Sequence, residues 1–252
     1  MSVGSMAFVG TTGGAGTTRT TVELGGVLAR AGRSTLVLDL DFATQGLSRF
    51  VDGRIDPDAT ALLAEENVPL SECVHGVPVE GEGRLDLLPS FAPFSGIADA
   101  KTSAAGARVG ERLDDAGEAF DHVLLDVPPV VSNQAVGGVT AAEAVAAVIP
   151  PTDRGVAALQ RERGRMADVG TEFDHVIAVG TDAGGAPPDA DHRVPALPGD
   201  APANGPITLE STGPYTARLA EIAGALFDDD DLGSAVDAKP GLLDRLSHEL
   251  RN

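Results

Sequence analysis

A glycine-rich segment near the start of the chain has the composition of a loop that binds an anion. Gly13, Gly14 and Gly16 stand directly before a helical pattern. Glycines allow the backbone to turn its amide groups inward around an anion, where a side chain would block the turn or the ligand. The positive end of the helix dipole, near Thr17, favours the same charge. The sequence therefore predicts a phosphate-binding loop made of Thr12, Gly13, Gly14, Ala15, Gly16, Thr17 and Thr18.

Two carboxylates follow the next apolar run along the chain. Asp39 and Asp41 come after residues 35–38. In a parallel sheet, ligands bind at the carboxyl ends of the strands, so we expect these acids and the glycine loop to face one crevice. The alternative is that the glycines form an ordinary strand-to-helix turn. Their position before an amphipathic helix and the downstream Asp-x-Asp favour the binding loop.

The elements that must position these residues alternate between strand and helix. Residues 6–9 and 35–38 are short apolar runs, and the apolar residues between them recur at helical spacing. This alternation predicts an α/β fold: a doubly wound, mostly parallel sheet with helices on both faces. Further strands are expected at 84–89, within 122–129, at 144–149, at 176–179 and at 193–197, and further helices at 106–120, within 141–150, at 154–169 and at 215–227.

The order strand, glycine loop, helix, strand and Asp-x-Asp resembles the ParA/MinD superfamily of P-loop ATPases, over most of the chain. The loop of that family usually reads Lys-Gly-Gly-x-Gly-Lys-Thr-Thr, and the acidic strand end at Asp126 resembles its Walker B segment. The resemblance implies ATP and Mg²⁺ as cofactors, with Thr18, Asp39 and Asp126 at the metal and Asp41 orienting the attacking water. It also implies a homodimer with nucleotide between its subunits.

The loop departs from that family at both lysines, which correspond to Thr12 and Thr17. A lysine supplies positive charge where negative charge builds up in phosphoryl transfer, and such stabilisation is usually the largest catalytic contribution. Threonine donates hydrogen bonds but carries no charge. Arg19 follows closely, but we expect it to point to solvent rather than to replace a lysine. The asparagine that the family places near adenine is also missing after residues 176–179.

We therefore expect a ParA/MinD-like nucleotide-binding protein with weak or absent ATP hydrolysis. It would act as a dimerising switch or scaffold for positioning in cell division or for polar or surface-appendage localisation. The loop is similar to those of the CpaE/TadZ group of pilus-assembly localisation proteins, which gives the deviation a precedent. An active MinD-type ATPase with a membrane-attaching tail is one alternative. A metabolic ATP-dependent enzyme on the same fold is the least favoured, because no further substrate-binding motif stands out.

Composition indicates the setting of the chain. Its 252 residues suit one α/β domain, and its net charge of −20 comes with two lysines, Lys101 and Lys239. High salt screens the repulsion within such an acidic surface, so we interpret the chain as a protein of a halophilic archaeon rather than an acidic mesophilic protein. The charge also disfavours DNA binding, which requires basic patches.

The cysteine and histidine content excludes several metal-dependent classes. Cys73 is alone, which excludes the iron–sulfur carriers and nitrogenase-type reductases that share the fold, because their clusters need paired cysteines. The five histidines show no ligand spacing. No signal peptide or transmembrane run appears, so we expect a cytoplasmic protein, peripheral at the membrane at most.

The end of the chain carries a second amphipathic pattern. We divide the chain into a domain at 1–227, an acidic linker at 228–240 and a C-terminal helix at 241–252. MinD proteins end in a similar helix, which attaches reversibly to membranes. The tail is poor in basic residues, so a protein partner or its own domain is as good a target as anionic lipid, and a frayed tail without a role is the remaining alternative. One face of the expected helix holds Leu242, Leu243, Leu246 and Leu250.

Overall fold

A single sheet forms the centre of the computed structural model, which describes residues 4–181, 187, 189–229 and 231–232. Within these residues the strands are β1 (Gly4–Gly10), β2 (Ser34–Asp39), β3 (His75–Val77), β4 (Arg84–Leu88), β5 (His122–Val127), β6 (Ala144–Ile149), β7 (His175–Val179) and β8 (His192–Val194). They form one sheet in the order β3-β4-β2-β5-β1-β6-β7-β8. Every neighbouring pair is parallel except β3 and β4.

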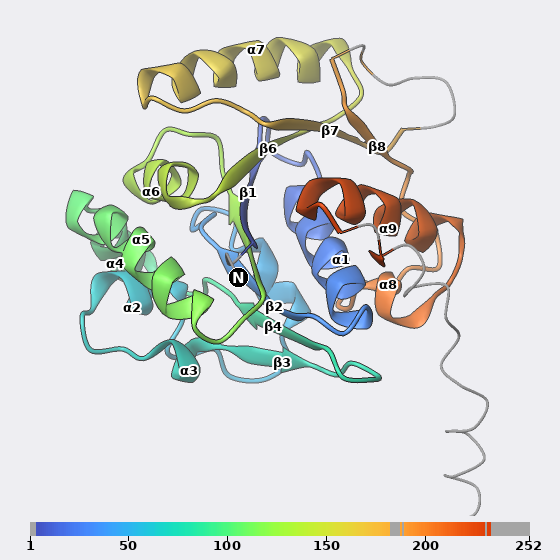
Figure 1. Cartoon of the computed structure of the whole chain (residues 1–252). Helices are drawn as coiled ribbons and strands as arrows, with labels where there is room; N and C mark the ends of the chain where they lie inside the picture. The colour runs from blue at the N-terminus through green and yellow to red at the C-terminus, as the bar shows by residue number, and fades with distance from the viewer. Residues whose placement is uncertain (1–3, 182–186, 188, 230, 233–252) are drawn as a thin grey trace, which may run out of the picture.

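Helices cover both faces of this sheet (Figure 1). They are α1 (Thr17–Arg30), the 3₁₀ helix η1 (Gly46–Phe50), α2 (Ala59–Ala64), α3 (Leu70–Cys73), α4 (Phe94–Ala100), α5 (Ser103–Gly117), α6 (Asn133–Ala141), α7 (Asp153–Asp168), α8 (Ile207–Glu210) and α9 (Pro214–Phe227). The doubly wound, mostly parallel α/β fold expected from the sequence is therefore confirmed.

The side chains of β1 alternate between two buried clusters. Met6 and Phe8 pack into the cluster under α1 and α9, whereas Ala7 and Val9 pack into the cluster under α5 and α6. This period of two is expected of a strand whose two faces are both covered. Burial on both faces explains why the sequence of β1 is an unbroken apolar run, and it fixes the start of the glycine loop at the end of a rigid central strand.

The predicted elements agree with the structure where the apolar pattern is strong. The predicted strands overlap β1, β2, β4, β5, β6, β7 and β8, and the predicted helices at 106–120, 154–169 and 215–227 overlap α5, α7 and α9. The helix placed within 141–150 is wrong, because α6 ends at Ala141 and the chain enters β6 at Ala144. The elements η1, α2, α3, β3, α4 and α8 were not predicted, since each is short and carries little periodicity.

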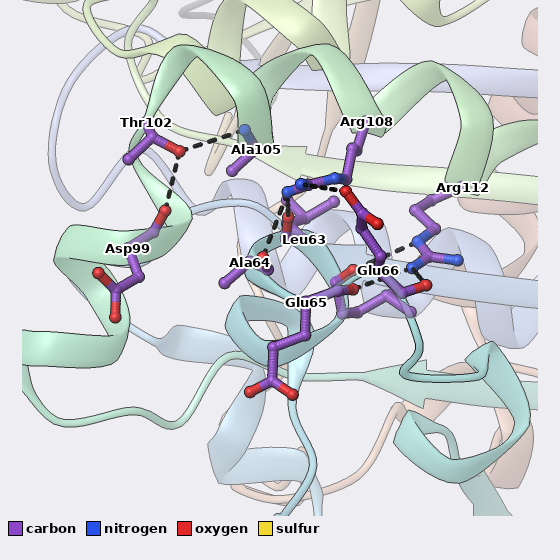
Figure 2. Close-up of polar contacts among 10 residues, drawn as sticks. Leu63, Ala64, Glu65, Glu66, Asp99, Thr102, Ala105, Arg108 and Arg112 are labelled. Carbon is purple, nitrogen blue, oxygen red and sulfur yellow. Dashed lines mark hydrogen bonds and ion pairs between the residues drawn. The ribbon is translucent and has the colours of Figure 1, made fainter.

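Two arginines of α5 hold the carboxyl end of α2 (Figure 2). The guanidinium of Arg108 donates to the carbonyl oxygens of Leu63 and Ala64, at 2.8 and 3.2 Å. Arg112 donates to the carbonyl oxygen of Leu62 at 3.2 Å and to those of Glu65 and Glu66 in the segment that follows. The last carbonyl groups of a helix have no partner within the helix, so these bonds from α5 satisfy groups that α2 leaves open.

The chain continues to contact the domain after α9. Asp229 forms a 2.7 Å ion pair with Arg33, and Leu232 is buried in the cluster under α1 and α9. The first residues of the segment predicted as a linker therefore pack on the domain. The predicted C-terminal helix at 241–252 lies outside the described residues. Within the residues described, no helix is long and apolar enough to cross a membrane.

Candidate functional site

The glycine loop lies between β1 and α1 and is open on one side. Gly14 and Gly16 have φ of 76° and 87°, a conformation that side chains with a Cβ rarely adopt. A Cβ built on Gly13 or Gly14 would meet no atom within 4 Å. No side chain caps the amino end of α1, whose N-cap is Gly16 itself. The amides of this helix end are thus available to an anion in the open space.

Two acids stand side by side where β2 and β5 end. Asp39 and Asp126 are register partners on these neighbouring strands, and both are buried. The oxygens of Asp39 are occupied, because Oδ1 accepts from the amide of Asp41 at 2.8 Å and Oδ2 accepts from the hydroxyl of Ser90 at 2.8 Å. Burial, followed by repulsion from Asp126, raises the pKa of Asp39 well above its ordinary value. Asp39 thus binds protein groups next to the site, and its place at the metal stays a prediction.

Asp126 differs because one of its oxygens has no partner. Its side chain lines the cavity beside the loop, is 2% exposed, and leaves Oδ2 without a hydrogen bond within the described structure. Burial raises the pKa of Asp126 to about 7, while the hydroxyl of Thr18 lowers it and Asp41 raises it. A buried, unpaired carboxylate oxygen beside a hydroxyl is an oxygen donor set that suits Mg²⁺.

Asp41 reaches the same cavity from the loop after β2. Its carboxylate accepts bonds from the amides of Ala43 and Thr44, both at 3.3 Å, and from the Thr44 hydroxyl at 2.7 Å. These bonds hold the carboxylate in one orientation. The loop and Asp41 therefore converge on one cavity, as the sequence predicts, whereas their individual roles stay predictions.

The cavity has a volume of about 550 Å³ and combines residues from distant parts of the chain. The segment after β8, including Leu197 and Ala201, forms part of its wall. The sequence did not predict that wall, because a short strand at 193–197 and the loop after it carry no signal of a binding site. The lining consists of Gly10, Thr12, Gly13, Gly14, Ala15, Gly16, Thr17, Thr18, Arg19, Asp41, Thr44, Gly46, Arg49, Phe50, Asp126, Val127, Pro128, Pro129, Leu197, Ala201, Pro202 and Ala203.

Two arginines line this cavity. The expectation that Arg19 points to solvent is wrong: its side chain is 18% exposed and forms a 2.7 Å ion pair with the buried Glu23. It also donates to the carbonyl oxygen of Pro202 at 2.8 Å and lies over the ring of Phe50. Arg49, the second arginine, was not considered from the sequence. The one feature of the sequence that could have indicated Arg49 is its basic character eight positions after Asp41.

The described residues fit a nucleotide with Mg²⁺. The space above Gly13 and Gly14 is open, the end of α1 is uncapped, and Asp126 offers an unpaired oxygen. Among the described residues, no protein group fills this space, caps this helix end or bonds to this oxygen. Together they provide amide donors for phosphate and an oxygen ligand for its metal.

Comparisons with known proteins agree with this geometry. Residues 4–172 match the family model AAA_31, described as an AAA domain. The chain is 36% identical to the chromosome-partitioning ATPase Soj of Thermus thermophilus over 58% of the chain and 53% of that protein. It is 31% identical to the chromosome partitioning protein ParA of Caulobacter vibrioides over 56% and 53% of the two chains. The chain thus spans about half the length of these relatives.

Solved structures share the fold across nearly the whole chain. The cell division ATPase MinD of Pyrococcus furiosus superposes with a TM-score of 0.69 and 17% identity, covering 88% of this chain and 97% of that one. MinD of Aquifex aeolicus gives a TM-score of 0.69 and 19% identity, over 89% and 97%. The family match, the sheet order and the glycine loop lead to one conclusion: the chain belongs to the AAA domain family, within the ParA/MinD superfamily of P-loop ATPases.

Proposed function

We propose that this protein binds ATP with Mg²⁺ and acts as a dimerising switch or scaffold in intracellular positioning, with weak or absent hydrolysis. The single observation that carries the proposal is the cavity in which the glycine loop, Thr18, Asp126 and Asp41 face one another. Relatives named for chromosome partitioning and cell division support positioning as the process. The described lining of that cavity contains no lysine, which supports the low turnover.

The residues of the chain would divide the work of binding. Amides of the glycine loop and of the first turn of α1 would hold the phosphates. Thr18 and the free oxygen of Asp126 would hold the metal, which supplies positive charge to the phosphates when bound. Asp41, held by its own turn, would orient a water. Thr12 and Thr17 would donate hydrogen bonds without the charge that speeds phosphoryl transfer.

Exposed apolar side chains at the same end of the sheet as the cavity support a dimer. In the described part of the chain, the exposed large hydrophobic residues are Phe91, Phe94, Val131 and Leu197, at 59, 85, 70 and 42% exposure. They follow the carboxyl ends of β4, β5 and β8, which is the edge of the sheet that also holds the cavity. Exposed apolar groups gathered on one edge favour burial against a protein surface. A second copy meeting this one across the nucleotide is the arrangement we propose.

Measurements of ATP binding, dimerisation and phosphate release in molar KCl test the proposal. We expect radiolabelled ATP to bind in the presence of Mg²⁺, and sedimentation to report a dimer only when ATP is bound. Phosphate release should be about 10²-fold or more below that of a lysine-bearing relative, because one lost charge-stabilising donor costs about that much. Asp41→Ala should abolish the residual release while leaving ATP affinity within about twofold. Release as fast as that of the relative would refute the low turnover, and a protein that binds no ATP would refute the proposal.

A further inference from the structure

The lining of the cavity carries two carboxylates and two guanidinium groups, and so no excess of positive charge. Asp41 and Asp126 bring carboxylates to it, and an ATP molecule would add several negative charges. The loop itself supplies amides but no lysine. Neutral donors alone bind a polyphosphate poorly beside two acids, because the negative charges repel one another. Mg²⁺ held at Asp126 would offset part of this repulsion, and a cationic side chain in the lining would offset more of it. Two arginines are present there.

Arg19 is already committed to the protein. Its guanidinium pairs with Glu23, which is fully buried and whose other contacts are the amides of Ile207 and Thr208 at the start of α8. Withdrawing Arg19 toward a ligand would leave the buried carboxylate of Glu23 without its charge partner, which is costly. The charge of Arg19 is therefore used to neutralise Glu23, although its buried Nε has no hydrogen-bond partner among the described residues.

Arg49, unlike Arg19, is not paired with an acidic side chain of the described chain. It lies in the last turn of η1, its side chain is exposed, and it lines the same cavity as the glycine loop. Across the part of the chain that the structure describes, its guanidinium has no hydrogen bond and no ion pair. An exposed arginine without a partner is often only a solvated surface charge. Arg49 differs because it lines the cavity that the glycine loop also lines.

The backbone beneath Arg49 is fixed against the loop. Leu47 is buried in the core cluster under α1, and Gln45 donates to the carbonyl oxygen of Ala92 at 2.9 Å. Gly46 packs so closely on the first turn of α1 that a Cβ there would lie 2.9 Å from the hydroxyl of Thr18. These contacts hold η1, and with it Arg49, beside the helix end that would bind phosphate.

We infer that Arg49 is the phosphate-binding cation of this site, supplied from η1 because the glycine loop has no lysine. This inference rests on the proposed nucleotide binding. A guanidinium presents a planar set of donors that matches phosphate oxygens two at a time, and it stays charged at all relevant pH values. Arg49 would therefore recognise the di- or triphosphate part of a nucleotide rather than its base.

Binding affinities of matched variants test the inference without relying on turnover. Dissociation constants for Mg-ATP and for inorganic tripolyphosphate are measured by titration calorimetry at one fixed KCl concentration. Arg49→Ala should weaken both by about tenfold or more, as expected for loss of charge-assisted hydrogen bonds, whereas Arg49→Lys should restore part of the loss. Arg161→Ala is the control, because Arg161 is exposed on α7, away from the cavity, and its loss changes the net charge equally.

The possible outcomes separate the two proposals. A wild-type protein that binds neither Mg-ATP nor tripolyphosphate overturns nucleotide binding and the role of Arg49 together. Wild-type binding that Arg49→Ala leaves within twofold overturns the role of Arg49 alone. An equal loss in Arg161→Ala also overturns it, because the effect would then come from net charge. Unchanged thermal unfolding of Arg49→Ala confirms that a weaker affinity is not a folding defect.

Discussion

Thr17 begins α1 at the position where related loops carry the phosphate-binding lysine. Its hydroxyl lies against Gly10, only 2.5 Å from the place that a Cβ on that glycine would take. Its carbonyl oxygen accepts a bond from Thr21 one turn later. The side chain is thus short and packed against the end of β1. It fills the position of the lysine without extending across the loop.

A lysine in place of Thr17 should raise both the ATP affinity and the rate of phosphate release. In Thr17→Lys, a flexible side chain would carry an ammonium group into the cavity beside Asp126. We expect ATP affinity to rise by about tenfold, equivalent to roughly 1.4 kcal/mol, and phosphate release to rise by about 10²-fold. Titration measures the ATP affinity, and a phosphate-release assay measures the turnover.

The control for that change is Thr212→Lys, which adds the same charge at an exposed position before α9. An equal gain in both variants would mean that net charge, rather than the position of the lysine, limits binding. No gain in Thr17→Lys would contradict the assignment of the lost lysine as the cause of low turnover.

The local part of the site could be predicted from the sequence, and the long-range part could not. Gly14 and Asp41 each follow a strand within a few residues, so their convergence follows from the rules of parallel sheets. Arg49 and Leu197 reach the cavity only through the folding of η1 and of the segment after β8. The orientation of Arg19 depended on Glu23 being buried by α8, which no local pattern reveals.

Among the elements, those with short or interrupted patterns were hardest to predict. Helix α6 contains adjacent glycines, Gly137 and Gly138, which weaken its helical pattern. The structure explains them, since a Cβ on Gly137 would lie 2.2 Å from the carbonyl oxygen of Gly106 in α5. The close packing of α5 and α6 therefore requires glycine, and glycine weakens the sequence pattern that predicts a helix.

Helix α2 is too short to be stable alone and depends on α5. We expect Arg112→Met to lower the free energy of unfolding by about 1–3 kcal/mol, because it leaves the carbonyl oxygens of Leu62, Glu65 and Glu66 without these donors. Urea unfolding followed by circular dichroism measures the change. ATP affinity should stay unchanged, since Arg112 lies outside the cavity of the glycine loop.

A matched substitution checks that interpretation. Arg161→Met removes an exposed arginine of α7 and should change the unfolding free energy by less than about 0.5 kcal/mol. If both variants unfold at the same urea concentration, the bonds from Arg112 to α2 contribute nothing to stability.

At the scale of the whole molecule, the charge of −20 is the dominant feature. The chain has 38 acidic residues against 18 lysines and arginines. Repulsion among so many like charges opposes the compact state, and dissolved salt reduces it. The interpretation of the chain as a halophilic protein therefore has a thermodynamic consequence.

Stability should rise with KCl. Between about 0.1 M and about 1 M KCl the Debye length falls from ~10 to ~3 Å, which screens most repulsion between surface carboxylates. We expect the Tm, measured by calorimetry, to rise steadily over this range. NaCl at the same concentrations should act equally if screening is the cause. A Tm that is constant or falls with salt would contradict the halophilic interpretation.

The central claim is that the glycine loop binds the phosphates of a nucleotide, and Gly13 permits its most direct test. A Cβ on Gly13 would meet no protein atom within 4 Å, and its φ is not in the left-handed region. Gly13→Val should therefore fold normally while filling the space of the anion. We predict that calorimetric titration in molar KCl gives Mg-ATP binding to the wild type and to Gly164→Val, a change on α7, and none to Gly13→Val. Equal affinity in all three proteins would contradict the account.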